Sequence, residues 1–134
     1  MSDEVGSAAG RTVASRILVA DDDALIRLVV RRTLEREGYE VVDAQDVSSA
    51  AEAARTCIAL AVLDAHMPGG TLAATIAGVR EAAGHDTPIL VLSGDRIAPP
   101  EVSGPAMAFL AKPASVSELL EAVDTLLRLP RTRD

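Results

Sequence analysis

Short apolar runs that end on polar residues constrain the fold of this chain more than any other feature. One run is followed by the three carboxylates of residues 21–23, and a later one ends at Asp64. Two further runs end on the hydroxyl of Ser93 and on the ammonium of Lys112. Carboxylates gathered at one point repel each other unless a hard cation lies between them. The pattern therefore predicts a Mg²⁺-dependent phosphoryl site built at the ends of several strands.

Apolar runs alternate with helical patterns along the rest of the chain. Strands are predicted at 17–20, 40–44, 58–63, 89–92 and 107–110. Helices are predicted at 24–37, 47–55, 71–83 and 116–127. This alternation indicates a parallel sheet covered on both faces, an α/β doubly wound fold, whose ligand crevice lies outside the carboxyl ends of the strands.

The predicted helix ends carry recognisable signals. Asp23 is placed to cap the first helix, Gly38 to end it, and Ser115 with Glu118 to form a capping box before the last helix. The first helix carries Leu25, Leu28 and Val29 on one face, which predicts its packing side.

The connection between the fourth and fifth predicted strands breaks the alternation. Residues 94–105 include three prolines and two glycines, which leave room for one helical turn at most, near 100–103. We therefore expect a shortened or irregular fourth helix.

Composition limits the class of protein. The 134 residues suit one compact domain, and with only one Tyr and one Phe its core must be aliphatic. A net charge of −7 argues against direct binding to nucleic acid or to an anionic membrane. No apolar run approaches the roughly 20 residues that span a bilayer, and residues 1–15 read as a disordered lead-in without the features of a secretory signal. We expect a cytoplasmic protein in which the single cysteine, Cys57, is a buried thiol.

The residues at the strand ends suit transfer of a phosphoryl group to a carboxylate. Asp21 and Asp22 would hold Mg²⁺, and Asp64 would both bind the metal and accept the phosphoryl group. Lys112 would neutralise one phosphate oxygen and Ser93 would donate a hydrogen bond to another. Taken singly, each of these residues is commonly a helix cap, a turn residue or a surface lysine. Their joint occurrence at four strand ends carries the prediction.

These motifs, in this order, resemble the receiver domain of two-component response regulators over about residues 16–129. The matching segments are Ile-Leu-Val-Ala-Asp-Asp-Asp at 17–23, Val-Leu-Asp-Ala-His-Met-Pro-Gly at 62–69, Val-Leu-Ser-Gly at 91–94 and Phe-Leu-Ala-Lys-Pro at 109–113. The resemblance implies a flavodoxin-like, five-stranded parallel sheet of order 2-1-3-4-5, with residues 130–134 left as a C-terminal tail.

The resemblance also implies specific roles. Asp64 would accept a phosphoryl group from a histidine kinase or a histidine phosphotransfer protein and lose it by slow self-hydrolysis, without turnover of an external substrate. The backbone carbonyl of His66 would be a further metal ligand. Ser93 and Phe109 would form the switch that changes binding to a downstream protein target.

Three alternatives stay open. A pseudo-receiver would keep the fold and bind partners without being phosphorylated. An aspartate-nucleophile phosphatase usually carries a second acidic residue two positions after the nucleophile, where this chain has His66, and usually has a cap for which this chain has no length. A flavin-binding protein of the same fold is disfavoured because the loop after the first strand is acidic.

Overall fold

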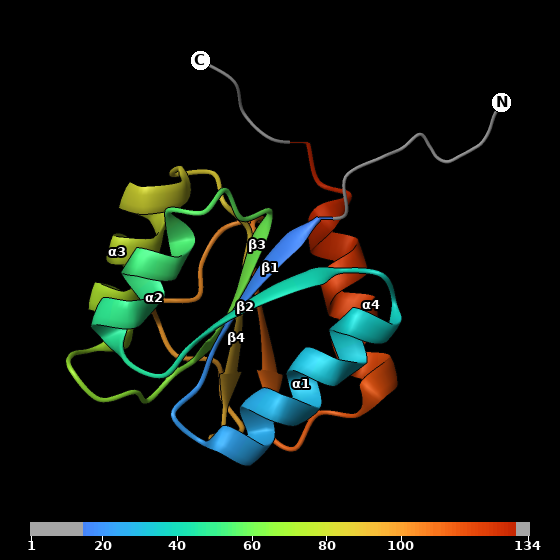
Figure 1. The fold of residues 1–134 in the computed structure, drawn as a ribbon. Helices are drawn as coiled ribbons and strands as arrows, with labels where there is room; N and C mark the ends of the chain where they lie inside the picture. The colour runs from blue at the N-terminus through green and yellow to red at the C-terminus, as the bar shows by residue number, and fades with distance from the viewer. Residues whose placement is uncertain (1–14, 131–134) are drawn as a thin grey trace, which may run out of the picture.

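The structure, a computed structural model, describes residues 15–130 and contains five strands and four helices (Figure 1). The strands are β1 (Arg16–Ala20), β2 (Glu40–Ala44), β3 (Leu60–Asp64), β4 (Ile89–Ser93) and β5 (Met107–Ala111). The helices are α1 (Ala24–Arg36), α2 (Val47–Ala54), α3 (Leu72–Ala83) and α4 (Val116–Leu127). The predicted lead-in and C-terminal tail fall, apart from Ser15 and Pro130, outside the described residues.

All five strands are parallel and follow the order β2-β1-β3-β4-β5. Helices α2 and α3 cover one face of the sheet, and α1 and α4 cover the other (Figure 1). This is the flavodoxin-like architecture that the sequence and the resemblance predicted, and the prediction is confirmed.

Alternate residues of the central strands divide the core into two layers. Leu18, Leu63 and Val91 belong to the layer under α2 and α3. Val19 and Val62 belong to the layer under α1 and α4. Because parallel strands are buried on both faces, every residue of β3 and β4 is buried. The largest fully buried side chains are all Ile, Leu or Val, so the core is aliphatic as expected.

The predicted helix caps are present. The Asp23 side chain accepts hydrogen bonds from the backbone N–H groups of Leu25 and Ile26, and Ser115 and Glu118 form a capping box. Gly38 follows the end of α1 with a φ of 91°, a conformation that glycine adopts without steric cost.

The predicted packing side of α1 is not the side that the structure buries. The helix buries Val30, Thr33 and Leu34, whereas the side chains named in the prediction are exposed: Leu25 by 68%, Leu28 by 42% and Val29 by 54%. The helix has two apolar stripes, and only the one at the i, i+3, i+4 positions from Val30 faces the sheet.

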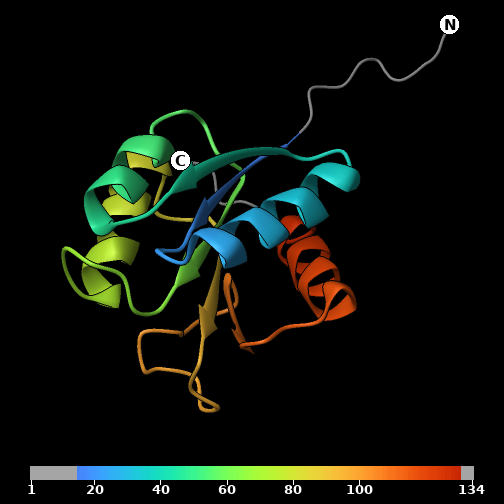
Figure 2. The same ribbon diagram turned by 60° about the horizontal axis from the view of Figure 1, so that its bottom comes forward.

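The segment between β4 and β5 contains no helix, which confirms the expected irregular connection. One turn forms where the backbone N–H of Val102 donates to the carbonyl of Pro99 over 3.0 Å. Figure 2 shows this segment, in orange, as an open loop below the sheet. Among the described residues, no helix combines the length and apolar character needed to cross a membrane.

The expectation of a buried Cys57 is wrong. Cys57 is exposed and lies in the turn after α2 with a φ of 64°. The chain reverses there in the left-handed region, so the residue belongs to the surface turn and not to the following buried strand.

Candidate functional site

The sheet register brings the carboxylates of two strand ends together. Ala20 of β1 pairs with Leu63 of β3, so Asp21 and Asp64 each follow one residue later on neighbouring strands. Asp21 continues the ladder through its backbone N–H, which donates to the carbonyl of Ala44 over 3.1 Å. Both aspartates are buried, at 2% and 6% exposure, and Asp22 beside them is exposed.

Lys112 reaches this pair of carboxylates from the far side of β4. Its backbone N–H donates to the carbonyl of Ser93 over 2.7 Å, which fixes the lysine at the end of β5. Its ammonium donates to Asp64 Oδ1 over 3.1 Å and lies 3.0 Å from Asp21 Oδ2. One cation therefore bridges two buried carboxylates.

The pKa values of Asp64 and Lys112 are both raised, for opposite reasons. Burial raises the pKa of the Asp64 carboxyl, and the neighbouring Asp21 adds to this, although the Lys112 ammonium and the His66 N–H oppose it. For Lys112, burial is the largest influence and lowers its pKa, but the Asp21 and Asp64 carboxylates outweigh burial and leave the pKa above its ordinary value. Lys112 therefore stays charged throughout the physiological range.

The carboxylates can hold a divalent cation. Asp21, Asp22 and Asp64 each offer one oxygen, and these oxygens lie within 4.8 Å of one another. Asp21 Oδ2 is buried and lies 3.0 Å from the Lys112 ammonium. Three carboxylate oxygens this close together are a donor set that suits Mg²⁺.

Ser93 and Phe109 lie on the same face of the sheet. The register pairs Phe109 with Val91, two residues before Ser93, and successive side chains of a strand alternate between faces. Ser93 is 1% exposed, and Phe109 is half-buried against the core layer under α2 and α3. Phe109 thus lies beside the site without forming part of the charged cluster.

His66 and Asp95 meet in a contact that sequence reasoning missed. His66 Nε2 lies 3.3 Å from Asp95 Oδ2, although 29 residues separate them. Asp95 also donates its backbone N–H to Ser93 Oγ over 3.1 Å. No spacing rule signals a contact between two loops, but the position of Asp95 two residues after a predicted site residue is a usable hint.

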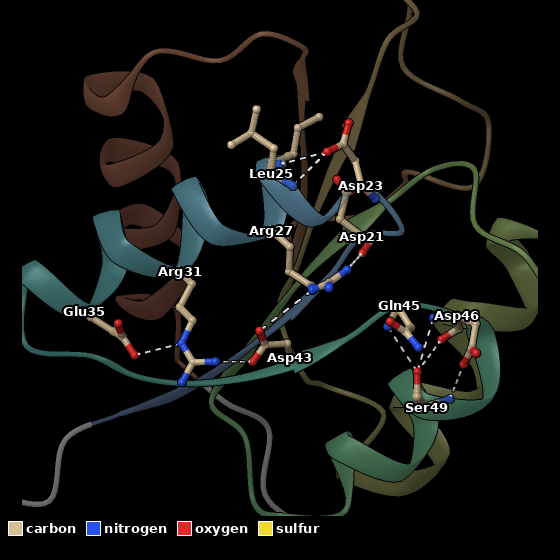
Figure 3. A network of polar contacts seen from close by, with 11 residues as sticks. Asp21, Asp23, Leu25, Arg27, Arg31, Glu35, Asp43, Gln45, Asp46 and Ser49 are labelled. Atoms are coloured by element: carbon tan, nitrogen blue, oxygen red, sulfur yellow. Dashed lines mark hydrogen bonds and ion pairs between the residues drawn. The ribbon is translucent and has the colours of Figure 1, made fainter.

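Arg27 supports the acidic loop from α1, as Figure 3 shows. Its guanidinium donates to the backbone carbonyl of Asp21 over 2.6 Å and lies 3.8 Å from Asp43 on β2. Asp43 is also paired with Arg31, 2.5 Å away, and Arg31 with Glu35, 3.0 Å away. The network ties α1 to β2 and fixes the backbone of Asp21, a predicted metal ligand.

An apolar cleft of about 440 Å³ adjoins the charged cluster. It lies between α1 and the β5–α4 loop, and Leu25, Val29 and Val116 line it with Lys112 at one side. These three apolar side chains are more than half exposed. An exposed apolar surface of this kind usually marks a site of interaction with another molecule.

Comparison with known sequences identifies related proteins. The sequence model of one family, described as response regulator receiver domain, matches residues 17–124. The transcriptional regulatory protein PdtaR of Mycobacterium tuberculosis is 38% identical over 127 residues, which cover 87% of this chain and 58% of that protein. The sensory/regulatory protein RpfC of Xanthomonas campestris is 36% identical over 124 residues, which cover 87% of this chain and 17% of that protein. The chain thus spans little more than half of the first relative and a small part of the second.

Solved structures show the same fold. The receiver domain of the hybrid histidine kinase CckA superposes with a TM-score of 0.73 at 30% identity, covering 85% of this chain and all of that one. The non-phosphorylated HemR receiver domain from Leptospira biflexa gives a TM-score of 0.77 at 27% identity, covering 90% of this chain and 99% of that one.

Proposed function

Since this chain belongs to the receiver domain family of two-component response regulators, we propose that it accepts a phosphoryl group on Asp64 and thereby changes its binding to a partner protein. The observation that carries the proposal is the Lys112 ammonium held 3.1 Å from Asp64 Oδ1, in a cluster with two further aspartates. The proposal includes a cytoplasmic location, where histidine kinases and phosphotransfer proteins present their phosphohistidines.

The transfer step uses an oxygen of Asp64 as the nucleophile. That oxygen forms a bond to phosphorus while the bond from phosphorus to the donor's imidazole nitrogen breaks, and the nitrogen keeps the electron pair and takes up a proton. Both hydrogen bonds that Asp64 accepts from described residues go to Oδ1, from Lys112 and from the His66 N–H. Oδ2 is therefore the oxygen available for attack.

The remaining roles are to neutralise the phosphoryl group, to donate a hydrogen bond to it and to bind the metal ion. The Lys112 ammonium lies where it would neutralise a phosphoryl oxygen, and Ser93 Oγ would donate to another. Asp21, Asp22, Asp64 and the backbone carbonyl of His66 would hold Mg²⁺. When bound, this ion offsets the repulsion between an anionic phosphoryl group and the aspartate cluster.

The response to phosphorylation is proposed to pass through Ser93 and Phe109. Drawing the Ser93 hydroxyl toward the phosphoryl group would empty space on the face of the sheet where Phe109 lies half-buried. Phe109 would then populate an inward packing, which is a shift between two states biased by a local charge. A downstream protein would bind one of the two states more tightly.

The apolar cleft beside α1 is proposed as the surface that receives the protein phosphodonor. When a phosphohistidine reaches Asp64, the donor protein that carries it must cover the surface next to the site. Leu25, Val29 and Val116 supply exposed apolar area there, within the same cleft as Lys112. Apolar contact would provide affinity, and the charged cluster would remain free for chemistry.

The test is the intact mass of the protein after incubation with phosphoramidate and Mg²⁺, with and without EDTA. We expect one added phosphoryl group that requires Mg²⁺ and that Asp64→Asn abolishes. Retained labelling in Asp64→Asn would overturn the assignment of the phosphoacceptor. No labelling by phosphoramidate or by a panel of histidine kinases would favour a pseudo-receiver.

A further inference from the structure

Both backbone polar groups of Asp21 are held from the side of β2 and α1. The N–H donates to the carbonyl of Ala44 over 3.1 Å, and the carbonyl accepts from Arg27 Nη1 over 2.6 Å. The paired register of β1 and β2 ends at Ala20 and Ala44, so the Asp21 carbonyl lies beyond the strand ladder. Asp21 is 2% exposed, and a buried carbonyl that lacks a donor is costly. The Arg27 guanidinium therefore supplies the hydrogen bond that a further strand residue would otherwise make.

Asp43 of β2 holds the same guanidinium through a different nitrogen. Asp43 Oδ2 lies 3.8 Å from Arg27 Nε, and Asp43 Oδ1 accepts from Arg31 Nη1 over 2.5 Å. Figure 3 shows the Arg27 side chain between Asp21 and Asp43. Asp43 shares its face of β2 with Val41, which packs in the core layer under α1 and α4. A carboxylate on this face gives Arg27 a countercharge at a fixed position on the edge strand.

The position of the Asp21 carboxylate depends on this backbone. Its Oδ1 accepts from the N–H of Asp23 over 2.9 Å, and its Oδ2 lies 3.0 Å from the Lys112 ammonium, so the side chain has little freedom of its own. Mg²⁺ requires nearly ideal octahedral geometry at short distances. A displacement of the Asp21 backbone would therefore be passed directly to a bound ion.

We propose that Asp43 is a positioning residue for the Mg²⁺ site, acting through Arg27 on the backbone of Asp21, an inference that rests on the proposed function. Asp43 lies outside the cluster of carboxylates that would bind the ion. The side chains of Arg27 and Asp43 are 19% and 31% exposed, so solvent partly screens the pair. Loss of the Asp43 charge should therefore weaken Mg²⁺ binding about two- to fivefold.

The experiment is calorimetric titration with Mg²⁺ of the unsubstituted chain, Asp43→Asn, Arg27→Met and the double variant. If Asp43 acts through Arg27, Asp43→Asn has no further effect once Arg27 is replaced. A direct attraction between the Asp43 charge and the cation would instead persist in the double variant. Glu40→Gln is the matched control, because it removes one carboxylate charge from the same strand, where Glu40 lies 3.1 Å from Arg16.

A second measurement separates positioning from general damage to the fold. The rate of labelling by phosphoramidate is followed as a function of Mg²⁺ concentration. In Asp43→Asn we expect the half-saturating Mg²⁺ concentration to rise about two- to fivefold while the rate at saturation stays the same. A fall in the rate at saturation would overturn the positioning role.

We expect Asp43→Asn and Arg27→Met each to weaken Mg²⁺ binding, the double variant to match Arg27→Met, and Glu40→Gln to match the unsubstituted chain. Effects that multiply in the double variant, or an unchanged affinity in Asp43→Asn, overturn the inference. Failure of phosphoryl transfer is seen separately, as an unsubstituted chain that binds Mg²⁺ and takes up no label. An unsubstituted chain that binds no Mg²⁺ overturns both proposals.

Discussion

The ammonium of Lys112 donates a hydrogen bond to Asp64 across β4, although 48 residues separate the two in sequence. The contact follows from the sheet order, because β3 and β5 flank β4. Strand β3 ends on Asp64 itself, and β5 ends at Ala111, one residue before Lys112. The same ammonium also forms an ion pair with Asp21, which follows β1. Residues at the ends of β1, β3 and β5 therefore form one cluster of opposite charges.

Lys112→Met should destabilise the protein by about 1–3 kcal/mol in the absence of divalent cations, because it leaves two buried carboxylates without their cation. Mg²⁺ should still bind and should recover much of this loss, since a ligand that binds only the folded state stabilises it. Urea unfolding with and without Mg²⁺ measures both effects.

Arg128→Met is the control for Lys112→Met. Arg128 is paired with Asp124 on the exposed surface of α4, so its loss should change stability by less than about 0.5 kcal/mol. An equal effect of the two substitutions would contradict a special role for Lys112.

Arg27→Met should weaken Mg²⁺ binding several-fold and lower stability by about 1 kcal/mol. The guanidinium fixes the backbone carbonyl of Asp21, and a charged donor lost from a half-buried carbonyl costs on that order. Calorimetric titration with Mg²⁺ checks the affinity. Arg32→Met, at an exposed position of the same helix, should leave both quantities unchanged.

Tyr39 provides a pH-dependent prediction with a clear sign. Burial raises the pKa of its phenol above the ordinary 10.0, and the nearby Asp124 and Glu37 add to the shift. Above pH 10 the unfolded chain loses this proton first, so stability should fall as pH rises toward the pKa of the folded state. Absorbance at the tyrosinate band reports this residue alone, because the chain has one tyrosine and no tryptophan. A midpoint equal to that in urea would refute the shift.

Leu25→Ser combined with Val29→Ser should reduce transfer from a phosphorylated histidine kinase at least tenfold while leaving labelling by phosphoramidate unchanged. Both side chains are exposed, so stability should hardly change. Ile97→Ser is the matched control, an apolar side chain 81% exposed in the β4–β5 loop. Loss of labelling from both donors would show damage to the site itself.

The sequence predicted the strand ends well because burial on both faces leaves little choice of residue. A run such as Val62 and Leu63 must be apolar, so the first polar residue after it marks the edge of the sheet. The same logic placed Asp21, Ser93 and Lys112, and proline content correctly predicted that no full helix follows β4.

Other features depend on tertiary structure that no local pattern records. Leu25, Leu28 and Val29 form a good helical stripe, but the sheet packs against the stripe that contains Val30 and Leu34. The contact of His66 with Asp95 requires knowledge of two loop conformations.

Lys112 is the only lysine among the 134 residues. Reagents directed at amines can therefore react at two kinds of position, the chain's terminal amine and the ammonium that bridges Asp21 and Asp64. Acylation of Lys112 by a dye or a biosensor surface would remove the positive charge that lies between Asp21 and Asp64, so labels for binding studies belong on the exposed thiol of Cys57 instead.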